Sequence, residues 1–143
     1  MTATAPLRHA ADVTHEDIGA VADFLLAALN DPDNVARPGT QAFRTNGALR
    51  ALVPQLEGSL SYQFQEEVMA EAQRDRMKAL ERIQDIRRTW NQLIDVASFW
   101  KDVAGYDAER WRTVRFDDAE QEREYRQWQE KQTAAAAAQD ASR

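Results

Sequence analysis

The chain has no cysteine, and its 143 residues include only two histidines, five glycines and four prolines. Without cysteine there are no disulfides, no thiolate metal ligands and no cysteine nucleophile. Neither His9 nor His15 lies near a candidate nucleophile in the sequence, which argues against a charge-relay hydrolase. The absence of cysteine also fits a reducing compartment, and we expect a cytoplasmic protein.

Long apolar runs are missing as well. The longest, residues 24–29, is far shorter than the roughly 20 residues that a membrane-spanning helix needs, and no charged-then-apolar leader opens the chain. The net charge of −6 is spread evenly over the sequence. An acidic chain is a poor candidate for binding nucleic acid, although a local basic face remains open. We therefore expect no membrane partner and favour protein partners.

Glycine and proline are absent from residues 59–103, and the second half of this stretch carries a heptad pattern. Its apolar positions have the a/d spacing with which one helix packs along another. These positions are Ile83, Ile86, Trp90, Leu93, Ala97 and Trp100. A continuous helix of this length would reach about 65–70 Å. A chain of this size has a radius of gyration of only about 14–15 Å, so the helix must bend, break, or project and find a partner.

Two shorter helices are predicted before this stretch. Thr14 and Asp17 have the spacing of a capping box, and an apolar stripe then continues to Leu29, where Asn-Asp-Pro ends the helix. A second helix is predicted over residues 46–56 and kinked by Pro54. Gly58 and Ser59 then follow as a break and a cap for the long helix.

The C-terminal third begins at Gly105, which we expect to end the long helix. Residues 105–116 are the least helical part, with one short extended segment at residues 112–116. Asp118, with Gln121 three residues later, is expected to open a charged helix whose apolar anchors are Tyr125 and Trp128.

The domain prediction is a disordered arm over residues 1–12, a single all-helical domain over residues 13–131 and an alanine-rich flexible tail over residues 132–143. The predicted fold class is all-α. A small helical head is combined with a long helix, straight or bent, that bears the heptad seam. The charged C-terminal helix folds back as a coiled-coil-like hairpin arm or extends away.

The favoured function is a non-enzymatic helical protein–protein interaction or assembly protein, either a homodimer or a subunit of a larger complex. Tryptophan is large for an a/d position and is enriched at interface hot spots. The predicted interface consists of Ile83, Ile86, Trp90, Leu93, Trp100 and Trp111. The plain alternative is that Trp90 and Trp100 pack on the first helix inside one chain.

A second hypothesis is a nucleic-acid or nucleoprotein-binding module. Residues 74–88 hold six basic and three acidic residues, and residues 110–116 interleave arginines with Trp111 and Phe116. Arginines contact phosphates and aromatic rings stack on bases. The candidate contacts are Arg74, Arg82, Arg87, Arg88, Arg110, Arg112 and Arg115. The alternative is that these arginines flank the apolar seam and pair with nearby acidic side chains.

A third hypothesis is a metal-dependent nucleotide hydrolase on helical carboxylates. Glu67 and Glu71 are four residues apart on one helix face and, with Glu66, have the chemistry to hold a hard divalent ion. The plain interpretation is a solvated acidic face. A di-iron site is excluded because no histidine follows a glutamate by three residues. We expect no catalytic residue, no resident metal and no cofactor.

Overall fold

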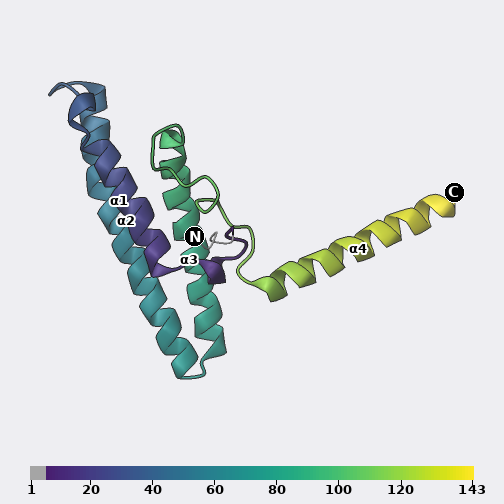
Figure 1. Ribbon diagram of the computed structural model, residues 1–143. Coiled ribbons are helices and arrows are strands. Elements are labelled where there is room, and N and C mark those ends of the chain that lie inside the picture. Colours follow the sequence, from purple (N-terminus) through teal and green to yellow (C-terminus); the bar gives the residue numbers. More distant parts are fainter. Residues whose placement is uncertain (1–5) are drawn as a thin grey trace.

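The computed structural model describes residues 6–143, and within them the chain is all-helical with no β-strand. This confirms the predicted fold class. The four α-helices of the described part are α1 (His15–Leu29), α2 (Gln41–Ala72), α3 (Arg76–Ala97) and α4 (Ala119–Ala141). Three short 3₁₀ turns accompany them, η1 (Ala10–Asp12), η2 (Pro32–Asn34) and η3 (Ser98–Trp100). In Figure 1, α1, α2 and α3 form the body, and α4 projects away from it.

The predicted start of α1 is confirmed. The Thr14 hydroxyl accepts a hydrogen bond from the Asp17 backbone N–H at 3.2 Å, and the Asp17 carboxylate accepts one from the Thr14 N–H at 2.8 Å. This reciprocal capping satisfies backbone donors that the first turn of a helix leaves free. One face of α1, including Val21 and Leu25, is completely buried.

α2 differs from the prediction of a short kinked helix followed by a break at Gly58 and Ser59. It is one helix of 32 residues that contains both Pro54 and Gly58. Pro54 lies on the exposed face, where it removes one backbone hydrogen bond and its ring crowds the carbonyl of Arg50. Val53 and Leu60 on the opposite face are completely buried. Packing of this buried face outweighs the local preferences of proline and glycine.

The predicted long helix breaks at residues 73–75, which form the turn between α2 and α3. Arg74 adopts a left-handed conformation with φ 58°. The N–H of Asp75 bonds to the carbonyl of Ala70 at 2.9 Å, as in a Schellman motif, and the Asp75 side chain caps α3 through the Lys78 N–H at 3.1 Å. The break resolves the length problem because α3 folds back along α2 as an antiparallel hairpin (Figure 1).

The core lies between α1 and the two helices of this hairpin. Leu25, Val53, Leu60, Trp90 and Leu93 have no solvent exposure at all. The indole N–H of Trp90 donates to the backbone carbonyl of Arg112 at 2.9 Å, so this buried polar group has a partner. The α3 heptad seam is therefore a core seam of the chain itself.

The N-terminal arm differs from the prediction of disorder over residues 1–12. Residues 1–5 lie outside the described residues, but Leu7 and Ala10 are buried. Ala10 donates its N–H to the carbonyl of Phe116 at 3.0 Å, and His9 forms a parallel bridge with Phe116. The predicted extended segment at residues 112–116 thus finds its neighbour in this arm.

The C-terminal parts also differ from expectation. α3 ends at Ala97 and continues as η3, whereas Gly105, with φ 95°, closes a later turn. α4 continues through Ala141, so most of the predicted alanine-rich tail is helical. Within residues 6–143, no helix combines the length and the apolar character that crossing a membrane requires.

Candidate interaction surfaces

The structure places most of the predicted interface inside the chain. Ile86, Trp90 and Leu93 are at most 2% exposed, and Trp111 is 7% exposed. Trp111 packs against Phe24 of α1, with ring centroids 5.1 Å apart. Only Ile83 and Trp100 keep partial exposure at the edge of the core. Among the six predicted interface residues, Ile83 and Trp100 are therefore the two whose side chains a partner can reach.

The arginines of the nucleic-acid hypothesis are mostly engaged with carboxylates. Arg110 is the clearest case, because its Nε and Nη2 donate to the two Asp17 oxygens at 2.8 Å each. Arg87 lies 2.9 Å from Asp117. The remaining pairs at 4 Å or less are Arg82 and Arg88 with Asp85, and Arg112 with Glu109. Arg74 forms the hairpin turn and Arg115 lies over the Tyr125 ring.

The carboxylates of the hydrolase hypothesis do not converge. Glu66 reaches across the hairpin to Lys78, with 3.2 Å between the carboxylate and the amine. Burial raises the pKa of Glu67, and the neighbouring Glu71 carboxylate raises it further. In residues 6–143 no three or more histidine, aspartate or glutamate side chains form a group with the geometry of a metal site.

The first two turns of α4 are attached to the body by several polar contacts, which we call the α4 root. Asp118 caps the helix by accepting from the Gln121 N–H at 2.8 Å, as the sequence predicts. Glu120 pairs with Arg76 at the start of α3, at 3.0 Å. Glu122 lies 2.6 Å from Nε2 of His9. These contacts fix the direction in which α4 leaves the body.

An aromatic ladder continues along the α4 root. The Arg115 guanidinium donates to the Tyr125 hydroxyl at 2.7 Å and lies 4.5 Å from the centre of its ring. Tyr125 in turn contacts Phe116 and Trp128, with ring centroids 5.5 Å and 5.8 Å apart. The pKa of the Glu122 carboxyl is lowered, mainly because of its hydrogen bond with His9. The ladder ends at Trp128, which is 55% exposed.

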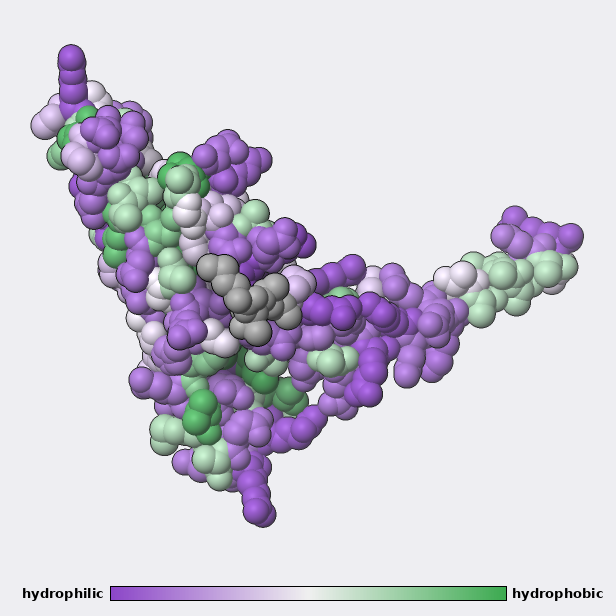
Figure 2. Space-filling view, viewed as in Figure 1, coloured by the Kyte–Doolittle hydropathy of each residue, from purple (hydrophilic) through white to green (hydrophobic). Residues whose placement is uncertain are grey.

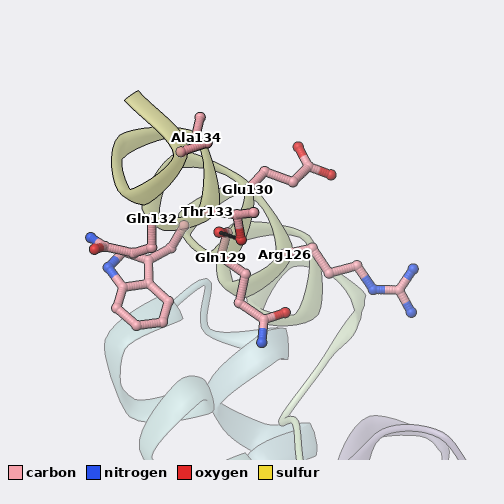
Figure 3. A pocket seen from close by; sticks show the side chains of 8 residues that line it. Arg126, Gln129, Glu130, Gln132, Thr133 and Ala134 are labelled. Carbon is pink, nitrogen blue, oxygen red and sulfur yellow. Dashed lines mark hydrogen bonds between the residues drawn. The ribbon is translucent and has the colours of Figure 1, made fainter. Parts of the chain in front are cut away.

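Beyond this root, the outer half of α4 is exposed along its length. α4 has no buried residue. A shallow depression of about 760 Å³ runs along it, but every residue that lines it belongs to α4, between Arg126 and Ala137. Figure 3 shows these side chains, such as Arg126 and Glu130, spreading outward from one helix. The depression is therefore the exposed side of α4 itself, and no residue of another element lines it.

An apolar groove lies at the open end of the hairpin, where α2 begins and α3 ends. We call it the Phe99 groove. It measures about 380 Å³ and is lined by Thr45, Asn46, Leu49, Val96, Phe99 and Trp100. Two smaller cavities of about 150 Å³ and 110 Å³ adjoin it, and Asn46 lines all three. Phe99 is 86% exposed, although it lies only two residues beyond the end of α3.

Sequence reasoning misses the Phe99 groove. The available signal is the adjacent pair Phe99 and Trp100, because two successive aromatic residues at a helix end cannot both face one core. Figure 2 shows apolar surface at the upper end of the body, again in its lower half, and along the outer part of α4, while most of the base of α4 is hydrophilic.

The chain matches no protein-family model, no curated protein and no solved structure. Two surfaces of the chain itself, the outer half of α4 and the Phe99 groove, therefore carry the functional inference.

Proposed function

We propose that this protein is a non-enzymatic, cytoplasmic interaction protein that enters a larger helical assembly through α4. One observation carries the proposal: α4 is a helix of 23 residues without a single buried residue. In globular proteins most of the stability of a helix comes from packing one of its faces. A helix that buries no side chain within its own chain is typical of an element whose face is covered by a partner.

The position of Trp128 supports the same proposal. Its indole is 55% exposed, and the residues on either side of it, 126–127 and 129–132, are polar. Large exposed aromatic side chains are costly in water and are the residues most enriched at interface hot spots. Trp128 therefore has the properties of the central contact residue of an interface.

The α4 root adds preorganisation. Contacts from Arg76 to Glu120 and from His9 to Glu122 hold the first turns of α4 at one angle to the body. A contact element that is already ordered loses less conformational entropy on association than a flexible tail does. Five of the seven arginines of the nucleic-acid hypothesis pair with carboxylates instead of forming one free basic face, so protein remains the favoured partner.

Site-specific photo-crosslinking in the cells that produce the protein tests this proposal. A photoreactive phenylalanine analogue replaces Gln127, which is exposed on α4. The matched control replaces Gln92, which is exposed on α3. We expect a discrete cross-linked product from position 127 and none from position 92. No product from position 127, or equal products from both positions, contradicts the proposal.

A further inference from the structure

We propose that the partner of α4 is a second copy of this chain, and that Trp128 of one copy enters the Phe99 groove of the next. This inference rests on the proposed interaction function and names the partner. Both surfaces are exposed, and they have the complementary forms of a projecting aromatic side chain and an apolar recess. A helix laid into an apolar groove is a common mode of protein recognition.

The groove suits an indole. Its walls are Leu49 on α2 and Val96, Phe99 and Trp100 at the end of α3, with only Thr45 and Asn46 supplying polar groups. An apolar recess with a few polar groups at its edge can hold an aromatic ring and still meet its N–H. The volume of about 380 Å³ leaves room for a tryptophan side chain.

One chain cannot fill its own groove. The α4 root contacts Arg76, the first residue of α3, whereas the groove lies at the last residues of the same helix. These positions are about 30 Å apart at 1.5 Å per residue. Figure 1 shows α4 leaving the body beside α3, with its outer end well apart from the open end of the hairpin. The contact must therefore join two molecules.

Charge complementarity selects a second copy as the occupant. Between residues 41 and 56, α2 carries Arg44 and Arg50 and no acidic residue. Beyond its root, residues 123–141 of α4 carry three acidic and three basic side chains, and the acidic Glu124 and Glu130 flank Trp128. Among the described residues, Arg44 and Arg50 pair with no carboxylate, and Glu124 and Glu130 pair with no basic side chain.

A charge of the opposite sign is also present on each of the two surfaces. Asp95, next to the groove residue Val96, has no ion pair within residues 6–143, and neither does Lys131 on α4. Trp128 lies between Glu124 and Lys131 along α4. A helix seated in the groove thus brings an acidic side chain toward the α2 arginines and a basic one toward Asp95. Such pairing sets the direction of the helix more than the affinity.

The contact is heterologous, because a different surface of each copy is used. Heterologous contacts continue from copy to copy and form rings or open filaments. This geometry permits a sharp test with two single-surface variants. Phe99→Ser damages only the groove and Trp128→Ala damages only the helix, and both side chains are exposed enough that folding is retained. Circular dichroism verifies the fold of each.

Absolute mass is measured by light scattering on a sizing column at two protein concentrations. We expect the unmodified chain to self-associate and each variant to weaken this association by about tenfold or more. An equimolar mixture of the two variants retains one intact groove and one intact helix, so it forms pairs and stops there. Met77→Ser, which alters a 71% exposed side chain at the hairpin turn, is the matched control and leaves association unchanged.

A chain that stays monomeric at both concentrations overturns the inference, as does association that survives either variant or a mixture that forms no pairs. Photo-crosslinking separates this failure from failure of the proposed function. A cross-link from position 127 to a different protein, together with a monomeric purified chain, leaves the interaction function standing and removes the second copy as its partner.

Discussion

At the scale of single residues, Trp90 combines the largest fully buried side chain of the core with a specific hydrogen bond. Trp90→Phe removes the indole N–H that meets the Arg112 carbonyl and leaves unfilled volume. We expect a loss of about 1–3 kcal/mol in the free energy of unfolding, measured by urea denaturation. Trp100→Phe is the control, because Trp100 is only partly buried, and it should cost clearly less. Equal losses would contradict the structure.

Asp17 is the residue at which stability should depend on pH. Burial by itself raises the pKa of the Asp17 carboxyl, but hydrogen bonds from Arg110 and Thr14 outweigh burial and hold the pKa below its ordinary value of 3.8. A lowered pKa in the folded state means that the charged form stabilises the fold above that ordinary value, and that this contribution disappears as the pH falls through the folded pKa.

Asp17→Asn is therefore expected to lower the free energy of unfolding by about 1.5–3 kcal/mol at pH 7. The difference between the variant and the unmodified chain should shrink as the pH falls below about 4, because the unmodified chain then loses the same charge. Urea denaturation at a series of pH values measures both effects. Asp23→Asn, on the exposed face of α1, is the control and should show neither. A difference that stays constant down to pH 2.5 would refute the role of the Asp17 charge.

At the scale of elements, the turn between α2 and α3 depends on a residue in an unfavourable conformation. Arg74 has φ 58°, a region that costs a residue with a Cβ atom about 1–2 kcal/mol and glycine nothing. Arg74→Gly should raise the free energy of unfolding by about 0.5–1 kcal/mol, measured by thermal or urea denaturation. Gln73→Gly, one position earlier in a right-handed conformation, should bring no gain. A loss of stability at position 74 would mean that the hairpin turns elsewhere.

At the scale of the whole molecule, the body and the outer half of α4 should be energetically separate. α4 has no buried residue, so a chain ending at Lys131 loses no core contact. Its free energy of unfolding should remain within about 0.5 kcal/mol of that of the full chain. Leu60→Ala, at a completely buried position, shows that the assay is sensitive and should cost about 2–5 kcal/mol. A large loss on truncation would show that the outer half of α4 packs on the body.

The sequence by itself determined the features that depend on a few neighbouring residues. The capping of α1 by Thr14 and Asp17 and the start of α4 at Asp118 follow from side chains within one turn of each other. The all-α class follows from apolar periodicity along single helices. The periodicity of α3 likewise identified an apolar seam before its partner was known. Such signals are local, and tertiary contacts reinforced them instead of opposing them.

Only the tertiary structure decided where the long helical stretch breaks and what covers its seam. The break lies at Arg74, in a stretch without glycine or proline, whereas α2 continues through Pro54 and Gly58 because its opposite face is buried. Trp90 points into the chain's own core, and Phe99, nine residues later, points out of it. The choice depends on which distant helices bury the same apolar face, and that free energy belongs to pairs of segments far apart in the sequence.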